Sequence, residues 1–244
     1  MSFHPDKCVQ LPVTRSRKPL VTEYHLHGHT LDTVASAEYL GVTIARDLSW
    51  SEHINKITAK ANKTLGFLRR NLKISSKSVK EIAFKTFVRP VLEYAAPVWD
   101  PHTAKETEKL EKIQRRAARF VLRRFRNTSS VTDMLSTLQW PSLQERRRVA
   151  RLTMLFKIKH GLAVAPHVKQ RLKTLPSRAR RGHKQQLERI PGKAQYHQCS
   201  FLPRTIRDWN RLSQHTVEAT TTTSFVARVR GAVDDSRSSA GSKE

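Results

Sequence analysis

The helical part of the chain begins in residues 49–72, which read SWSEHINKITAKANKTLGFLRRNL. Ser49 or Ser51 can cap the first turn, because a serine side-chain oxygen accepts a hydrogen bond from the unpaired amides there. Apolar residues then recur every three or four positions, which is the spacing of one buried helix face through about residue 72. The residues of this stripe are Ile54, Ile57, Ala61, Leu65, Leu68 and Leu72.

Upstream of this helix, residues 1–48 have the alternating pattern of short strands. Candidate strands lie at residues 9–13, 20–26 and 38–44, and the last of these is the clearest. Gly28 allows a tight turn after the second strand. The N-terminal part is therefore predicted to be β-rich.

Three histidines, His25, His27 and His29, alternate around the turn at Gly28. Three imidazoles on one face of a straight strand could bind a transition metal. Because the glycine is expected to break the strand, and no carboxylate or thiol is nearby in sequence, we favour surface histidines at a turn. No metal site is predicted.

Downstream of residue 72 the helical spacing continues in several segments. Residues 75–78 can cap a second helix, within which Pro90 predicts a kink or a break. A third helix is predicted over residues 103–126, and shorter helices are predicted at 131–138 and 141–160. The residues expected on the buried face of the second helix are Val79, Ile82, Ala83, Phe87, Val91, Leu92 and Ala95.

Residues 161–198 are rich in Lys, Arg, Gln, His, Pro and Gly and show little periodicity, which predicts a flexible basic linker. Order is expected to return at residues 201–212 and 224–229. The Ser-rich end, residues 234–244, is predicted to be disordered.

The charge balance is extreme, with 46 Lys and Arg against 20 Asp and Glu and a formal net charge of +26. A compact chain with this charge repels itself unless a polyanion screens it. We therefore expect RNA, DNA or an RNA–DNA duplex as the partner, with an anionic membrane surface as the weaker alternative.

Nothing in the sequence predicts a membrane span or a secretory signal. The two cysteines, Cys8 and Cys199, are too few for a disulfide framework or a Cys-rich zinc site, which favours a reducing compartment. An intracellular location, nuclear or cytoplasmic and not secreted, is expected. The basic run at residues 178–184 could act as a nuclear import signal or as a flexible phosphate clamp, but basic linkers are common.

The third helix carries a row of cations along one side. On a helical wheel at about 100° per residue, the apolar residues Leu110, Ile113, Ala117, Phe120 and Val121 share an arc of roughly 100°. The cations occupy another arc of about 100°, centred roughly 140° away. The predicted nucleic-acid-binding residues are Lys112, Arg115, Arg116, Arg119, Arg123 and Arg126. A merely solvated face usually mixes signs, whereas this one has no acid after Glu111.

Four tryptophans, Trp50, Trp99, Trp140 and Trp209, lie near predicted helix ends. They could stack on bases, but we favour core anchors. Arg204 and Arg207 could contact phosphate or could belong to a solvated face.

The motifs with the most information are spread over most of the chain, and it is their joint order that is specific. They are Phe3, Lys7-Cys8, Tyr39-Leu40-Gly41-Val42, Leu48-Ser49-Trp50, His53-Ile54, Lys60-Ala61, Val88-Arg89-Pro90-Val91-Leu92-Glu93-Tyr94, Trp99-Asp100-Pro101, Gln114-Arg115-Arg116-Ala117-Ala118-Arg119, Pro203-Arg204-Thr205 and Trp209-Asn210.

This order resembles the region after the catalytic centre in non-LTR (LINE-like, jockey-type) retrotransposon reverse transcriptases, from about residue 1 to 230. The resemblance implies a mainly α fold with a small N-terminal β-rich segment, a helical thumb-like bundle and a flexible basic C-terminal extension. The implied parts are a palm remnant (1–48), a helical thumb-like domain (49–160), a basic linker (161–200), a short helical segment (201–230) and a disordered tail (231–244).

The resemblance also implies that the catalytic aspartates lie upstream of residue 1. Polymerases of this family hold two magnesium ions with such carboxylates. The adjacent aspartates present here, Asp234 and Asp235, follow no apolar strand. We therefore expect this chain alone to be inactive and to need no cofactor, with magnesium serving the full-length enzyme.

Tyr39, Leu40, Gly41 and Val42 match the family's primer-grip hairpin, and Gly41 would allow close backbone approach. The implied function is gripping of a template–primer duplex, and an upstream palm and fingers segment supplied in trans is a candidate partner. A domesticated RNA- or DNA-binding protein and a non-functional genomic remnant remain alternatives.

Overall fold

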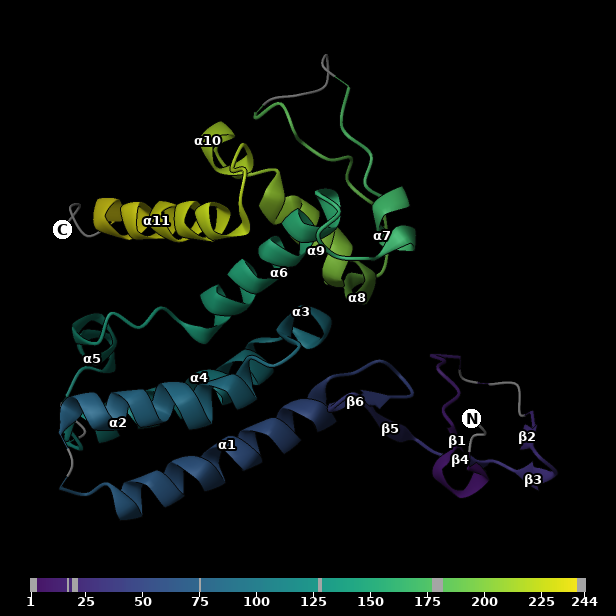
Figure 1. Cartoon of the computed structure of the whole chain (residues 1–244), viewed down its shortest axis with the longest axis horizontal. Helices are drawn as coiled ribbons and strands as arrows, with labels where there is room; N and C mark the ends of the chain where they lie inside the picture. The colour runs from purple at the N-terminus through teal and green to yellow at the C-terminus, as the bar shows by residue number, and fades with distance from the viewer. Residues whose placement is uncertain are drawn as a thin grey trace. The chain divides into compact units, whose positions relative to one another are not determined.

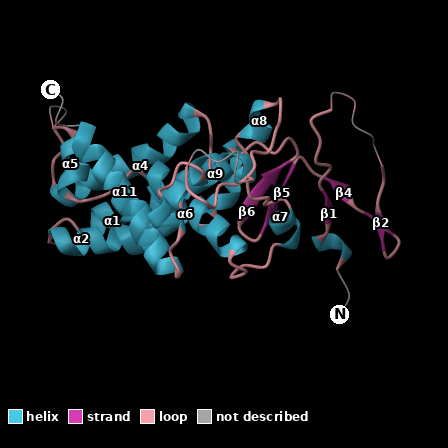
Figure 2. Cartoon of the chain, turned by 90° about the horizontal axis from the view of Figure 1, so that it is seen from above, coloured by secondary structure: helices cyan, strands magenta, loops and turns pink. Residues whose placement is uncertain are grey.

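The computed structural model describes residues 4–16, 18, 22–74, 76–126, 129–176 and 182–240, and for 233–240 only the backbone. Helix accounts for 55% of the chain and strand for 8%, which confirms the mainly α fold (Figure 2). The chain forms two compact units (Figure 1). Unit 1 comprises Met1–Ala95 and Thr103–Leu138, and unit 2 comprises Ala96–His102 and Gln139–Glu244.

The strands of unit 1 form three separate two-stranded pairs. The parallel pair is β1 (Val9–Gln10) with β4 (Asp32–Thr33), and the first antiparallel pair is β2 (His25–Leu26) with β3 (His29–Thr30). The second antiparallel pair joins β5 (Ser36–Tyr39) to β6 (Val42–Ala45), with Ser36 opposite Ala45 and Tyr39 opposite Val42. The single strand expected at 38–44 is therefore two strands.

The helices of unit 1 follow the sequence prediction closely in position. They are the 3₁₀-helix η1 (Pro5–Lys7), α1 (Ser51–Asn71), α2 (Lys77–Ala83), the π-helix η2 (Phe84–Val88), the 3₁₀-helix η3 (Arg89–Leu92), α4 (Ala104–Leu122) and α5 (Val131–Thr137). The predicted α1 stripe is buried from Ile54 to Leu68, while Leu72 caps the helix and is half-buried. Helix α1 packs on α4. The apolar residues of α4 are buried as predicted: Leu110, Ile113, Ala117, Phe120 and Val121.

The second helix buries only part of the predicted face: Ala83 and Leu92 are buried and Val91 and Ala95 are half-buried. Val79, Ile82 and Phe87 are 47%, 63% and 59% exposed, whereas Lys80 and Phe84 are buried. The prediction assumed one α-helical period up to Pro90. Instead the π-helix η2 inserts a wider turn before the proline, and this turn moves Phe87 off the buried face. Val79 and Ile82 precede the turn and are exposed already within α2.

Unit 2 is built around one apolar cluster on α6. Its helices are α3 (Ala96–Trp99), α6 (Leu143–Lys159), α7 (Pro166–Gln170), α8 (Gln195–Gln198), α9 (Phe201–Trp209), α10 (Gln214–Val217) and α11 (Thr222–Ala240). The centre of the cluster, with no more than 1% of each side chain exposed, is Leu152, Leu155, Phe156, Leu187, Ile206, Trp209, Val217, Phe225 and Val229.

Three boundaries differ from the sequence prediction. Residues Ala96–His102, expected within the 49–160 domain, belong to unit 2. Residues 139–160, expected within the 49–160 domain, belong to unit 2, because the apolar side of α6 packs against α9 and α11. In the tail, α11 continues through Ala240, and residues 241–244 lie outside the described part of the chain.

The expected flexible linker 161–200 is in large part folded onto unit 2. Leu187 is buried at 1% exposure, and Asn210 holds its backbone by accepting from the Leu187 amide and donating to its carbonyl, each at 2.8 Å. His183 is also buried, and its Nε2 lies 3.0 Å from the Trp209 carbonyl oxygen. The sequence prediction missed these buried residues, because the segment is rich in Lys and Gln and only a few of its side chains enter the core.

Candidate nucleic-acid interface

The predicted basic row lies on α4, but the helix ends four residues earlier than expected. Arg123 is its C-cap in the left-handed conformation, with φ 54°, so Arg126 lies beyond the helical row. The cations that remain in helical register are Lys112, Arg115, Arg116 and Arg119. The early stop has a simple cause, since a left-handed residue at this position cannot continue a right-handed helix.

Several of the predicted cations are held by neighbours within unit 1. Arg115 forms an ion pair with Glu108, and Arg123 donates to the Lys73 carbonyl oxygen. Arg116 donates from Nη1 to Asn62 Oδ1 on α1 at 2.9 Å. A guanidinium has five N–H donors, so each of these arginines keeps donors for a second acceptor.

Two further lysines belong to the same side of α4 and were missed because the wheel began at residue 110. Lys105 and Lys109 lie one or two turns earlier, within about 60° of Lys112 on the wheel. Lys105 is exposed, and Lys109 donates from Nζ to Asn55 Oδ1 at 2.7 Å. Extending the wheel to the helix start would have found both.

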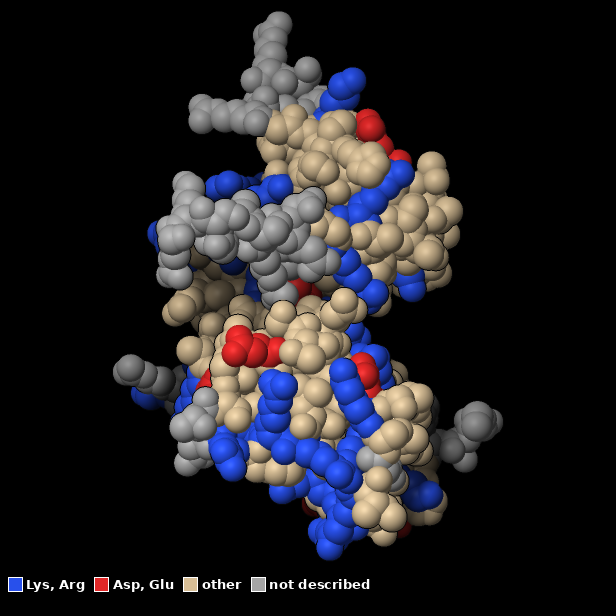
Figure 3. All heavy atoms as spheres, turned by 90° about the vertical axis from the view of Figure 1, so that its left-hand side faces the viewer, with Lys and Arg blue, Asp and Glu red and all other residues tan. Residues whose placement is uncertain are grey.

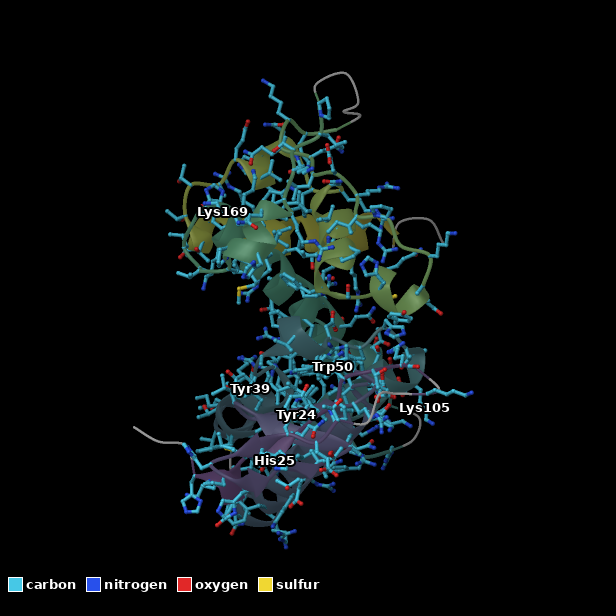
Figure 4. All side chains as sticks on the ribbon, turned by 90° about the vertical axis from the view of Figure 1, so that its right-hand side faces the viewer. Tyr24, His25, Tyr39, Trp50, Lys105 and Lys169 are labelled. Atoms are coloured by element: carbon cyan, nitrogen blue, oxygen red, sulfur yellow. The ribbon has the colours of Figure 1, made fainter. Side chains whose placement is uncertain are left out.

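Three of these cations form a straight row. Lys105, Lys112 and Arg119 are spaced seven residues apart, close to two full turns, so they lie about 10 Å apart on one line. Within the described residues, no hydrogen bond or ion pair is made by these three side chains. Lys105 and Lys112 are exposed and Arg119 is half-buried, and Lys105 is labelled in Figure 4.

The acids of α4 differ in exposure: Glu111 is half-buried, and 47% of the Glu108 side chain is exposed. Glu106 is buried at 9% exposure and accepts hydrogen bonds from the hydroxyls of Ser51 and Thr103. Glu108 is the ion-pair partner of Arg115. Lys and Arg outnumber Asp and Glu along α4. Seen from the side on which α1 ends and α2 begins, unit 1 also shows many Lys and Arg atoms with few Asp or Glu atoms among them (Figure 3).

The residues predicted as primer-grip-like form the tip of the β5–β6 hairpin. Leu40 and Gly41 have φ of 48° and 78°, which is the two-residue turn with both central residues left-handed. Tyr94 fixes this turn by donating from its hydroxyl to the Leu40 carbonyl oxygen at 3.0 Å. A Cβ on Gly41 would lie 3.3 Å from Tyr94 Cε1, so both the positive φ and the tight contact favour glycine at this position.

The hairpin tip is apolar and exposed, while its base is anchored. Tyr39 and Leu40 are 66% and 73% exposed, whereas Val42 is buried (Figure 4). The next residue, Thr43, donates its backbone N–H to His53 Nδ1 on α1 at 3.1 Å. Burial lowers the pKa of His53, which keeps this nitrogen available as an acceptor.

The alternating histidines form no described metal site. His27, with φ 50°, and Gly28 make the β2–β3 turn, and His25 Nδ1 lies 3.0 Å from Thr30 Oγ1. Among the residues that the structure describes, no group of three or more His, Cys, Asp or Glu could hold a metal ion. Asp234 and Asp235 lie in helix α11, where the structure describes only their backbone.

Three of the tryptophans are core anchors, as favoured from the sequence. Trp99 and Trp209 have no exposed surface, and Trp140 is 7% exposed. Trp50 is half-buried at the N-cap of α1. Of the basic run at 178–184, residues 178–181 lie outside the described residues.

Arg204, one of the two arginines considered for phosphate contact, belongs to a buried ion cluster inside unit 2. Asp100 accepts from Arg147 Nε at 2.8 Å and from Arg151 Nε at 2.7 Å, and Arg204 Nη1 lies 3.2 Å from Asp100 Oδ2. Burial lowers the pKa of Arg204, and the charge of Asp100 opposes that shift. Arg207 donates to the Gln198 carbonyl oxygen at 3.0 Å.

Comparison with known proteins adds no assignment: family models, curated proteins and solved structures were each searched, and none matches this chain. In the described part of the chain, no helix is long and apolar enough to cross a membrane.

Proposed function

We propose that this chain binds the phosphate backbone of a nucleic-acid duplex, without sequence preference, through the cationic side of α4 and the adjoining edge of α1. The observation that carries the proposal is the line of Lys105, Lys112 and Arg119, which have no described ion pair, while the neighbouring acids Glu106 and Glu108 are engaged by Ser51 and Arg115. A row of positive charges raises the electrostatic free energy of the folded chain unless an anion binds to it.

The neighbouring contacts favour phosphate over a generic anion. Lys109 and Arg116 of α4 donate hydrogen bonds to Asn55 and Asn62 of α1. These bonds hold two more cations in defined positions beside the row. Groups that are held in place lose less side-chain entropy on binding. The spacing along the row, about 10 Å, is a small multiple of the 3.4 Å phosphate rise in one strand.

In the context of the sequence resemblance, we propose that this surface is the duplex-gripping part of a retrotransposon reverse transcriptase, with the β5–β6 hairpin near the primer end. Support comes from the joint order of the motifs and from the rigid, exposed tip at Tyr39 and Leu40. The substrate would then be an RNA–DNA hybrid or another template–primer duplex.

The test compares two triple variants of the full chain that remove equal charge. The site variant is Lys105→Ala, Lys112→Ala and Arg119→Ala. The control is Arg171→Ala, Lys173→Ala and Lys193→Ala, which are exposed cations of unit 2. Binding of a labelled duplex of about 20 base pairs is followed by fluorescence anisotropy at several salt concentrations.

The site variant should weaken binding to every duplex sequence about equally. It should also lower the salt slope by roughly two to three units, because each removed cation leaves about one phosphate no longer neutralised. The control should change the slope by less than one unit. Equal effects of the two variants would mean that net charge alone drives binding, and the assignment to α4 would then be wrong.

A further inference from the structure

The basic side of α4 ends next to an exposed phenylalanine. Phe125 follows the last helical residue, Leu122, within the next three positions, and 55% of it is exposed. The guanidinium carbon Cζ of Arg69, near the end of α1, lies 5.6 Å from the centre of the Phe125 ring. This distance is within the range of a cation–π contact. Arg69 is itself exposed, so the contact forms at the surface of unit 1.

The packing of α1 on α4 explains why Arg69 meets this ring. Hydrogen bonds between the two helices join residues 54 positions apart, as in the pair of Asn62 and Arg116. Arg69 comes two helical turns after Asn62 on the same side of α1, and the same offset would set it opposite Arg123. Two cations in such a position repel each other. Instead, Arg123 ends α4 in the left-handed conformation, and the chain turns so that Phe125 lies under Arg69.

The turn that carries Phe125 is held by two hydrogen bonds. The Arg123 guanidinium donates to the Lys73 carbonyl oxygen, which lies between α1 and α2. The backbone N–H of Arg124 donates to the Arg119 carbonyl oxygen at 3.1 Å. Because the turn is fixed in this way, the ring loses little conformational freedom when it binds a ligand.

The surroundings of the ring are basic. Residues 53–80 contain no Asp or Glu, and neither do residues 112–132. In the part of the chain that the structure describes, Arg124 and Arg126 are exposed and form no ion pair. Lys and Arg atoms are numerous at this end of unit 1 (Figure 3). An exposed ring among such cations fits a ligand that combines an aromatic face with negative charge, as a nucleotide does.

We propose that the ring of Phe125 and the guanidinium of Arg69, here called the stacking pair, bind an unpaired base beside the duplex that lies along α4. The inference rests on the function proposed above and narrows the ligand to a duplex with a single-stranded extension. Bases inside a duplex are covered by their neighbours, so only an unpaired or terminal base can place its face against a ring.

The position of the stacking pair supports this choice of ligand. Arg119, the last member of the solvent-side row, precedes Phe125 by less than two helical turns of chain, so phosphates held by the row lead toward the pair. A second copy of this chain is disfavoured as the occupant, because two chains with net charge +26 repel each other.

The experiment uses the full chain and a set of labelled ligands with matched charge. A duplex of about 12 base pairs, long enough to cover the row, carries an extension of about four thymidines. The matched ligand has abasic residues in the extension, which keep the phosphates and remove the bases. Each extension is placed at the 3′ end in one ligand and at the 5′ end in another, and a blunt duplex completes the set. Fluorescence anisotropy gives the affinities.

The variants change one ring at a time. Phe125→Ala removes the aromatic face, and Phe125→Trp keeps an aromatic face of larger area. The matched control is Phe67→Ala. Phe67 belongs to the same unit, is 57% exposed and lies about 160° around α1 from Arg69.

The wild-type chain should bind the thymidine extension at least about five-fold more tightly than the abasic extension, at one end of the duplex or at both. Phe125→Ala should reduce this ratio to below about two-fold, whereas Phe125→Trp and Phe67→Ala should keep it. Affinity for the blunt duplex should change by less than about two-fold in every variant, because phosphate contacts set it. Circular dichroism should show equal helix content in all the proteins.

Three outcomes would overturn the proposal. The first is equal binding of the thymidine and abasic extensions by the wild-type chain at both ends, which would show that no base stacks. The second is a loss of the ratio in Phe67→Ala as large as in Phe125→Ala, which would place the stacking elsewhere. The third is self-association of the wild-type chain in sedimentation that Phe125→Ala alone abolishes, which would assign the ring to a second copy.

Failure of the proposed function has a different signature. It appears as an unchanged salt slope for the blunt duplex when Lys105, Lys112 and Arg119 are replaced by Ala. That measurement does not depend on the extension, so a normal change of slope together with equal binding of the two extensions contradicts the stacking pair alone.

Discussion

Replacing Asp100 by Asn should strongly destabilise unit 2. The carboxylate has 3% of its side chain exposed and accepts from Arg147 and Arg151, whose side chains are 0% and 3% exposed. Asn is nearly isosteric but neutral, so the substitution leaves the buried Arg147 guanidinium without its anion and Arg151 with Asp208 alone. Breaking a buried pair in this way costs about 3–5 kcal/mol.

A series of variants separates the buried charge from ordinary hydrogen bonding. Asp208 accepts from Arg151 Nη2 at 3.0 Å, but its side chain is 18% exposed, so Asp208→Asn should cost about 1–2 kcal/mol. Arg147→Met should also cost less than Asp100→Asn, because in the described part of the chain the two terminal nitrogens of Arg147 are buried without a partner. Removing them relieves a desolvation penalty that partly offsets the missing bond.

Urea unfolding followed by tryptophan fluorescence measures these differences, since Trp99, Trp140 and Trp209 all lie in unit 2. The expected order of destabilisation is Asp100→Asn first, with Arg147→Met and Asp208→Asn well below it. If Asp100→Asn leaves too little folded protein to measure, its circular dichroism spectrum at low temperature should show the loss directly. A cost for Asp100→Asn below about 1 kcal/mol, or below that of Asp208→Asn, would refute the view that this carboxylate organises the unit.

Three other changes test different parts of the molecule. Gly41→Ala should destabilise unit 1 by about 1–2 kcal/mol in thermal unfolding, because φ is 78° and the new methyl group would contact the Tyr94 ring. A neutral result would mean that the turn can adopt another conformation. Burial lowers the pKa of His183, so the folded state takes up its proton at lower pH than the unfolded state. The stability of unit 2 should therefore be full above the unfolded value of about 6.5 and fall as the pH drops below it, and His183→Gln should reduce that dependence. Finally, the purified chain with primed RNA template, deoxynucleotides and magnesium should extend no primer above a buffer blank. The reason is that its adjacent aspartates, Asp234 and Asp235, lie in helix α11 rather than beside a strand. Extension that survives removal of contaminating polymerases would contradict this prediction.

The regular helices show how far periodicity reaches. The stripe from Ile54 to Leu68 and the apolar arc of α4 are buried as predicted, because helical spacing places these residues on one side whatever they pack against. Predicting α2 failed for a physical reason. The exposure of Phe87 depends on the π turn that follows α2, and such a turn has no period that a sequence pattern reveals. Val79 and Ile82 precede that turn, and Lys80 and Phe84 occupy the buried side in their place.

The candidate site was predicted in part. The helical wheel predicted the cationic side of α4, and the resemblance pointed to the segment Tyr39–Val42. In the structure these residues form one side of α4 and the tip of the β5–β6 hairpin. The ion pair of Arg115 joins residues 7 positions apart, and the contacts of Lys109 and Arg116 with Asn55 and Asn62 join residues 54 positions apart. No local pattern specifies such partners.

The amino-acid sequence by itself determined the mainly helical class, the excess of positive charge and the sides of the two long helices, since composition and helical period are properties of neighbouring residues. Only the tertiary structure decided that residues 139–160 join unit 2, that much of the basic segment 161–200 folds onto it, and that Lys80 is buried while Phe87 is exposed. The reason is that burial is settled by contacts between distant segments, whose joint packing outweighs the local preference of any one residue.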